Sequence, residues 1–186
     1  MEDGSIKSLS MAIYTKKGDR GETSLFLKKP IPVSKDSVRV RAIGALDEAN
    51  SYLGVIVSEA PESKNPLNEI QRNLFVAGSI LAGARLRFSK VKTRKLERVI
   101  DRLEGSLPVL KNFVLPGGGK AGAKLFFARA LVRRAERAVV SLDLVEAVRP
   151  EILVYLNRLS DYLFMMARGV NFKGGFKEEI WRGSSK

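Results

Sequence analysis

The sequence contains no cysteine and no histidine. Without cysteine the chain cannot form disulfides, thiolate nucleophiles or cysteine-based metal sites. Without histidine it lacks the commonest general base, any Ser-His-Asp triad and the usual nitrogen ligands of metals. Chemistry that needs a proton shuttle near neutral pH is therefore disfavoured, whereas chemistry done by positioning and charge neutralisation remains open.

Long apolar runs are also missing. None approaches the roughly 18 residues that span a membrane, and residues 1–10 lack the apolar stretch of a signal peptide. These absences predict a cytoplasmic protein without a membrane partner. We expect residues 1–10 to be a disordered extension and residues 11–186 to be a single domain, because the length suits one domain and a 45% hydrophobic content suffices for a core.

Acidic residues are few relative to basic ones. The chain has 33 Lys and Arg against 20 Asp and Glu, which gives a net charge of +13. Such a surplus favours an anionic partner, such as a nucleotide, a nucleic acid or an acidic surface. A solvated, ion-paired surface explains the same charge equally well, so charge alone leaves both interpretations open.

The helical spacing of apolar residues predicts five helices. The first follows Ser34 and ends before Pro61, and the second begins with Asn65-Pro66 as cap and first turn. The third has Thr93 as candidate N-cap, and the last two span about residues 120–140 and 150–170. Strand–helix alternation is absent, and an all-α, up-and-down bundle is the simplest architecture for these helices.

Two segments outside the helices, residues 11–27 and 174–181, are predicted to be extended. Residues 11–27 form a short extended segment interrupted by Gly18 and Gly21. Pro30 and Pro32 exclude a helix over residues 28–33, and the tail after Gly174 is expected to be extended as well.

Residues 14–24 are a candidate phosphate-binding loop. The segment combines Gly18 and Gly21 with hydroxyl side chains and with Lys16 and Lys17. Such a loop can direct several backbone N–H groups and ammonium groups at a phosphate chain. An ordinary polar turn is the alternative, and the spacing alone favours that alternative.

Arginines form a stripe on the predicted fourth helix. Arg129, Arg133 and Arg137 recur every four residues and therefore share one face, with Glu136 beside them. Guanidinium groups on one face repel each other unless anions lie among them, which favours triphosphate binding. The alternative is an exposed face paired with acidic residues of a neighbouring helix.

Three other groups of residues are weaker candidates. Asp47 and Glu48 of the first predicted helix are either solvated or paired with the arginines, within a subunit or across an interface. Asn157 could bond a base or ribose, or belong to a polar flank. Residues 117–122 match G-x-G-x-x-G, but the surrounding βαβ unit is missing, and Ala121 stands where a Walker A loop needs Ser or Thr. We interpret that turn as the beginning of a helix.

These motifs, in this order, resemble those of the PduO-type ATP:cob(I)alamin adenosyltransferases. The family's YTKxGDxGxT matches residues 14–23, and its GxxDExN matches residues 44–50. Its FxLPGG matches residues 113–118, ARxxxRRAER matches 128–137, and NRLSDYLF matches 157–164. The resemblance extends over roughly residues 11–170, and five motifs in register are far more specific than any one of them.

The resemblance implies a five-helix, ferritin-like bundle that forms a homotrimer, with ATP bound between subunits. It implies transfer of the 5′-deoxyadenosyl group of ATP, with Mg²⁺, to cob(I)alamin, forming adenosylcobalamin and releasing triphosphate. The residues implied to contact the phosphates are Tyr14, Thr15, Lys16, Lys17, Gly18, Asp19, Thr23, Ser24 and Lys35. The remaining ATP contacts implied are Arg133, Arg134, Glu136, Arg137 and Asn157.

The resemblance also assigns catalytic roles. Asp47 and Arg129 match a pair that bridges subunits at the active site, Arg133 matches a catalytic arginine, and Phe113 matches an aromatic residue that closes the lower face of the corrin. The implied protein partners are a reductase and a cobalamin-dependent enzyme, with no nucleic acid or membrane. Cobalt in its lowest oxidation state is a strong nucleophile, so the absence of a histidine base agrees with this chemistry.

One residue departs from the family pattern. The family has histidine in its motif LHxAR, and this chain has Phe126 at that position. We expect the change to alter the polarity of the pocket rather than to abolish activity. The alternatives are an ATP-binding sensor that has lost catalysis and a basic helical nucleic-acid-binding module, which the interleaved glutamates and the glycine–lysine loop fit poorly.

Overall fold

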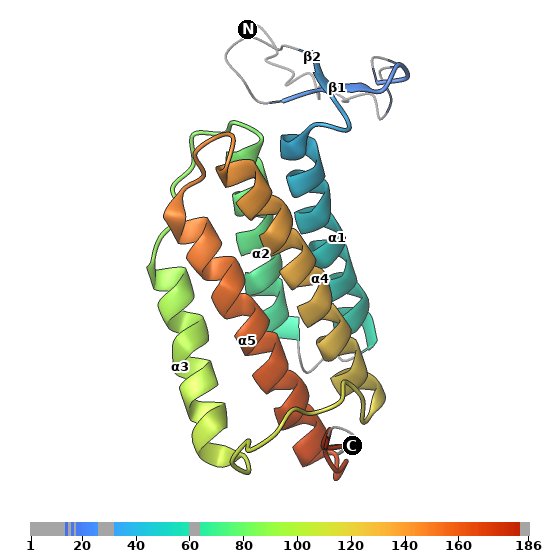
Figure 1. Cartoon of the computed structure of the whole chain (residues 1–186), viewed down its shortest axis with the longest axis vertical. Coiled ribbons are helices and arrows are strands. Elements are labelled where there is room, and N and C mark those ends of the chain that lie inside the picture. The colour runs from blue at the N-terminus through green and yellow to red at the C-terminus, as the bar shows by residue number, and fades with distance from the viewer. Residues whose placement is uncertain (1–13, 15, 17, 26–31, 60–63, 183–186) are drawn as a thin grey trace, which may run out of the picture.

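The described residues form an antiparallel bundle of five helices (Figure 1). The computed structural model describes residues 14, 16, 18–25, 32–59 and 64–182, so the predicted extension over residues 1–10 lies outside them. The fold prediction is confirmed. The helices are α1 (Val38–Glu59), α2 (Lys64–Leu81), α3 (Val91–Ser106), α4 (Lys120–Asp143) and α5 (Pro150–Lys173).

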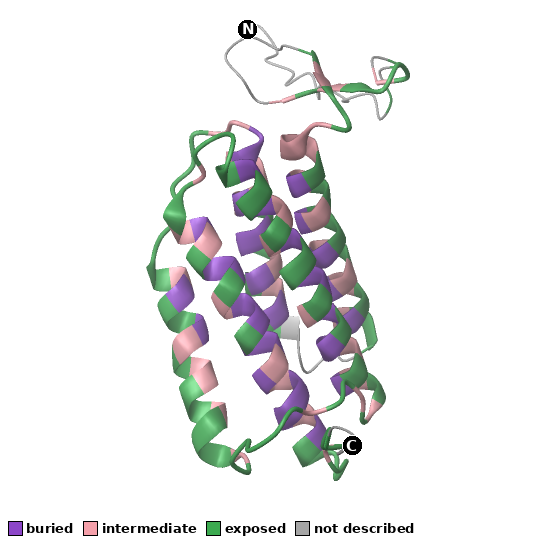
Figure 2. Ribbon diagram, in the orientation of Figure 1, coloured by how far each residue is buried: buried purple, intermediate pink, exposed green. Residues whose placement is uncertain are grey.

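The core lies between α1, α2, α4 and α5. Helix α1 contacts both α2 and α4, and α5 contacts both α4 and α3. Of the apolar positions that recur at helical spacing in α1, all are buried except Val38, which is partly buried, and buried residues line the inner faces of the helices (Figure 2). Truncating a fully buried leucine in such a core to alanine costs about 2–5 kcal/mol. These core positions of α1 are Ala42, Leu46, Ala49, Leu53 and Ile56.

Two predicted helix starts differ from the structure. Helix α3 begins at Val91 and has no side-chain cap, and Thr93 is buried in its first turn rather than capping it. Helix α2 begins at Lys64, which places Asn65 and Pro66 inside the first turn. Helix ends depend on tertiary contacts as well as on capping residues, so a cap sequence alone does not fix them.

A short β-hairpin precedes the bundle. Strand β1 (Glu22–Ser24) pairs antiparallel with β2 (Pro32–Ser34), with Glu22 opposite Ser34. The sequence predicted extended chain here but not the pairing. Pro32 is the first residue of its strand, a position where proline is tolerated in a sheet. The hairpin lies beyond the N-terminal end of α1, at the far end of the bundle from the C-terminal tail (Figure 1).

Candidate active site

The predicted arginine face lies on the outer side of α4. Arg133 and Arg137 are exposed, whereas Arg129 is half-buried, with its guanidinium 5.7 Å from the ring centroid of Phe164. Burial lowers the pKa of Arg129, and the charge of Arg133 lowers it further, while Asp161 opposes the shift. Arg129 is therefore the arginine of this face whose charge is most desolvated. An anion bound beside it would offset that cost.

Residues of α1 and α5 flank the arginine face. Arg134 forms an ion pair with Glu48 of α1. The side-chain amide of Asn157 on α5 donates a 3.1 Å hydrogen bond to the carboxylate of Glu136. The structure thus brings together four residues that come from three separate sequence motifs. Asp47 is exposed and forms no ion pair with any residue that the structure describes.

The N-terminal loop is organised by backbone and lysine contacts. Lys35 donates from Nζ to the carbonyl of Gly18 at 2.8 Å, and its own N–H donates to the carbonyl of Gly21 at 2.8 Å. Asp19 lies in the turn that precedes β1, and Thr23 and Ser24 lie on β1 itself. Tyr14 and Lys16 are exposed, and Lys16 has a φ of 58°. Thr15 and Lys17 lie outside the described residues.

The loop and the arginine face are not joined within one chain. Over residues 14–25 and 32–35, as far as these are described, no hydrogen bond or ion pair connects the loop to α4. The hairpin instead projects past the end of α1 (Figure 1). The two candidate phosphate-binding groups therefore lie apart in a single subunit.

Phe113 lies at the opposite end of the bundle, in the segment between α3 and α4. Its side chain is 80% exposed, so an apolar ring faces solvent. The C-terminal tail pairs with this segment: Trp181 N–H donates to the carbonyl of Phe113 at 2.9 Å, and Leu115 N–H donates to the carbonyl of Glu179 at 2.8 Å. The extended tail predicted from the sequence is therefore part of a two-stranded contact that holds the Phe113 loop.

A buried ion pair anchors the tail, and the sequence did not predict it. Arg168 of α5 is 3% exposed and donates to Glu178 at 3.1 Å and to the carbonyl of Pro108 at 2.8 Å. On α5 Arg168 falls on the same helical face as Asn157 and Asp161, which are exposed. It is buried because the tail folds back over the end of α5. The Arg168–Glu178 pair depends on where a loop and the tail meet in the folded chain, so no local sequence pattern predicts it.

The glycine turn is the beginning of α4, as the sequence predicted. Gly118 has a φ of +94°, which a side chain would strain. Asn171 accepts from Gly119 N–H at 3.1 Å and donates to the carbonyl of Gly117 at 2.9 Å. A Cβ on Gly122 would lie 2.0 Å from Asn171 Oδ1. Gly118 and Gly122 are thus required by their close approach to Asn171.

An apolar groove of about 320 Å³ lies between α1 and α2, and no sequence pattern had indicated it. Asp47 lies at this groove, together with Phe75, whose ring is 70% exposed. Asn50 also lines it, and its side-chain oxygen is buried without a hydrogen-bond partner among the described residues. An exposed aromatic ring beside an unsatisfied amide is typical of a surface that another molecule covers.

The sequence is similar to a family model and to known proteins. A family model described as cobalamin adenosyltransferase matches residues 13–170. The chain is 41% identical over 185 residues to the corrinoid adenosyltransferase of Bacillus subtilis (strain 168), with 94% of each chain covered. It is 39% identical over 184 residues to corrinoid adenosyltransferase MMAB of Mus musculus, covering 91% of this chain and 77% of that one.

Solved structures of adenosyltransferases are also similar to this chain. A variant of a PduO-type ATP:corrinoid adenosyltransferase from Lactobacillus reuteri, complexed with cobalamin and ATP, superposes with a TM-score of 0.87. It is 35% identical, and the match covers 92% of this chain and 100% of that one. A second variant of that enzyme, complexed with ATP, has a TM-score of 0.84 and 36% identity over 91% of this chain and 100% of that one. The chain belongs to the cobalamin adenosyltransferase family.

Proposed function

We propose that this chain, an ATP:corrinoid adenosyltransferase, uses cob(I)alamin as its acceptor at a site shared between subunits of a homotrimer. The electron pair of cobalt forms the Co–C bond to the 5′ carbon of ATP while the bond from that carbon to the triphosphate oxygen breaks. Triphosphate leaves with the electron pair of the broken C–O bond, so no proton transfer is needed. The observation that carries the proposal is the exposed α4 arginine face beside the Glu136–Asn157 pair.

ATP would lie along α4. Arg133, Arg134 and Arg137 would neutralise the charge that develops on the leaving triphosphate, as guanidinium donors suit phosphate oxygens. Asn157 holds the Glu136 carboxylate, so the pair presents a fixed acceptor to a ribose hydroxyl or base. We expect Mg²⁺ to be held mainly by phosphate oxygens, which are its preferred ligands. No group of three or more acidic side chains among the described residues could hold a metal ion.

The remaining phosphate contacts would come from a neighbouring subunit. The loop that carries Tyr14, Gly18 and Lys35 is joined to its own α4 by no described contact, so it is free to reach the α4 of another chain (Figure 1). Thr15 and Lys17 would complete the loop with Lys16, Asp19, Thr23 and Ser24. The groove at Phe75 and Asn50 supports a covered surface on α1 and α2.

The corrin would lie between Arg129 and Phe113. Asp47 and the half-buried Arg129 would pair across the subunit interface, because each lacks a carboxylate or guanidinium partner within the described part of its own chain. Phe113 would form an apolar wall below the corrin that excludes water and a lower axial ligand. The exposed ring and the tail that holds its loop support this role.

The setting of the reaction is a further part of the proposal. No helix in the described residues has the length and hydropathy to cross a bilayer. We place the enzyme in the cytoplasm, where a reductase would supply the reduced corrinoid and a cobalamin-dependent enzyme would receive the product.

Substitution of Arg133 tests the site. With ATP, Mg²⁺ and chemically reduced cob(I)alamin, the wild-type chain should form the light-sensitive Co–C product. The change in absorbance measures the rate at which this product forms. Arg133→Ala should slow turnover by about a hundredfold or more, because one donor to the developing charge is lost. Arg98→Ala, which removes an exposed arginine of α3, is the matched control. Circular dichroism should show an unchanged bundle, and full activity of Arg133→Ala would overturn the assignment.

A further inference from the structure

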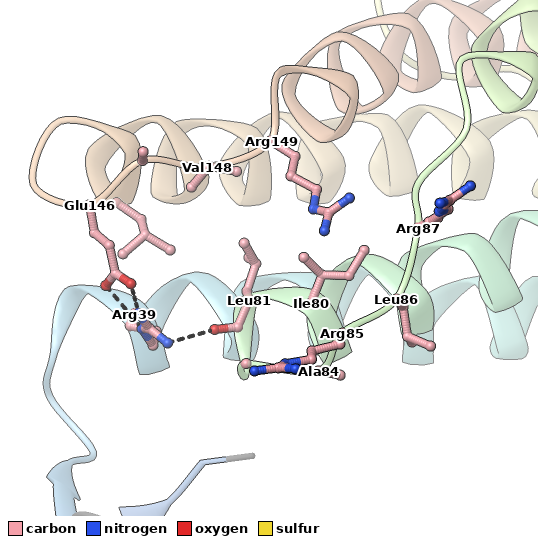
Figure 3. A pocket seen from close by; sticks show the side chains of 13 residues that line it. Arg39, Ile80, Leu81, Ala84, Arg85, Leu86, Arg87, Glu146, Val148 and Arg149 are labelled. Carbon is pink, nitrogen blue, oxygen red and sulfur yellow. Dashed lines mark hydrogen bonds and ion pairs between the residues drawn. The ribbon is translucent and has the colours of Figure 1, made fainter. Parts of the chain in front are cut away.

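A cavity of about 600 Å³ lies at the end of the bundle that carries the hairpin (Figure 3). Three segments far apart in the sequence line it: the first turn of α1, the end of α2 with residues 83–87, and the connection between α4 and α5. None of its lining residues belongs to the α4 arginine face or to the Phe113 loop. The cavity is therefore separate from the site of the proposed reaction.

The cavity is lined by four arginines and one acidic residue. Glu146 is that acidic residue, and Arg39 neutralises it with a 3.2 Å hydrogen bond from Nε. Arg39 also donates to the carbonyl of Leu81 at 3.2 Å, so each of its three guanidinium nitrogens already has a partner. Figure 3 shows this pair at one end of the cavity.

Three arginines remain without counter-charge. Arg85, Arg87 and Arg149 are exposed, and none forms an ion pair or side-chain hydrogen bond with a described residue. Figure 3 shows Arg149 and Arg85 on either side of Ile80 and Leu81. Three like charges around one cavity raise each other's free energy, and an anion in the cavity removes that cost.

The lining also selects the kind of anion. Guanidinium groups present planar pairs of donors that match phosphate oxygens. Ile80, Leu142 and Val148 add an apolar floor, which strengthens charge interactions by excluding water. A volume of about 600 Å³ suits a small molecule rather than a duplex or a folded partner.

We propose that this cavity binds the phosphate chain of a small polyphosphate, either a nucleoside polyphosphate or free triphosphate. It would be a second anion site on each subunit. The proposal goes beyond the adenosyl transfer and does not depend on it. It also gives a use to part of the basic surplus that one ATP molecule does not require.

The test is calorimetric titration of the purified protein with inorganic triphosphate at fixed ionic strength. The variant Arg85→Gln/Arg149→Gln removes two charges from the cavity. Arg94→Gln/Arg98→Gln removes two charges from exposed positions of α3 and is the matched control. We expect two classes of site in the wild type and in the control. In the cavity variant the second class should weaken tenfold or more, because charge-assisted hydrogen bonds are lost.

Equal binding by the cavity variant and the control would overturn the proposal, since general attraction to a basic surface would then explain it. A single class of site in the wild type that the cavity variant keeps unchanged would also overturn it. Titration with ATP separates the two sources: tighter binding of ATP than of triphosphate at the second site identifies a nucleotide, and equal binding identifies the phosphate chain alone. Adenosylation by the cavity variant should persist, so this outcome is distinct from a failure of the proposed reaction.

Discussion

Phe113 combines an exposed apolar ring with a firmly held backbone. The ring is 80% exposed, while the backbone carbonyl accepts from Trp181. Exposure of a large ring is unfavourable unless a ligand covers it, whereas the fixed backbone gives it a defined position. An exposed ring on a fixed backbone is suited to the proposed role of Phe113, which is to pack against one face of the corrin.

Substitution of Phe113 should separate the two substrates. Phe113→Ala should leave the Kd for ATP within about threefold of wild type, because the residue lies at the other end of the bundle from the hairpin, and should slow adenosylation by about tenfold or more as water enters. Calorimetry and single-turnover absorbance measure the two quantities. Leu144→Ala, at an 83% exposed position at the end of α4, is the control. Loss of ATP binding in Phe113→Ala would mean that the ring is structural.

Phe126 is a buried support rather than a surface of the site. It is 4% exposed, and its ring packs edge-on against Phe164 with centroids 5.8 Å apart. The ring of Phe164 in turn forms a cation–π contact with the guanidinium of Arg129. The departure from the family histidine therefore places an apolar ring against Phe164, which contacts the proposed site residue Arg129.

Restoring the histidine should cost stability and change turnover little. The ring nitrogens of an imidazole at this buried position need hydrogen-bond partners, and burying them without partners is unfavourable. Phe126→His should therefore lower the free energy of unfolding by about 1–3 kcal/mol. Turnover should stay within about tenfold, since the transfer needs no proton. Urea unfolding and steady-state rates check both, with Phe126→Leu as an apolar control. A rise in turnover well above tenfold would show that the histidine takes part in the chemistry.

The helices could be predicted from the sequence, and the contacts at their ends could not. Repeating apolar positions such as Leu46 and Leu53 specify an inner face because the helical period is local. The five motifs gave the family, the bundle and the ATP:corrinoid activity, all of which are confirmed. The Arg168–Glu178 pair and the groove at Phe75 are different, because each depends on segments that meet only in the folded chain. The roles of individual site residues stay predictions.

The C-terminal tail should depend on its buried ion pair. Glu178→Ala leaves Arg168 buried without its counter-charge, which costs about 3–5 kcal/mol when a pair is fully buried and less here because Glu178 is partly exposed. The tail should detach from the Phe113 loop, which hydrogen exchange of the Trp181 amide detects. Corrin adenosylation should slow while ATP affinity is kept.

The neighbouring Glu179→Ala provides the control for this change. Glu179 contributes only its backbone carbonyl to the bond with Leu115, and its side chain is exposed. The substitution removes the same charge without breaking the ion pair. If both variants loosened the tail equally, the net charge of the tail would be responsible and the Arg168 pair would not.

In the proposed homotrimer, the assembly of subunits would decide whether the active site is complete. One chain carries both the loop held by Lys35 and the arginine face at Arg133, yet no described contact joins them. A ring of three identical subunits, each offering its loop to the next, would complete three equivalent sites. In such a ring the two halves of a site belong to different chains.

This arrangement predicts complementation between inactive variants. Lys35→Ala and Arg133→Ala should each be nearly inactive alone, because every site then has one damaged half. In each trimer that contains both variants, one of the three sites combines an intact loop with an intact α4, so about one third of the wild-type activity should return. Co-expression with two affinity tags isolates the mixed trimers, and the Co–C absorbance assay measures their turnover. Mixed trimers that stay inactive would place both halves of the site in one chain, since no exchange of subunits could then restore it.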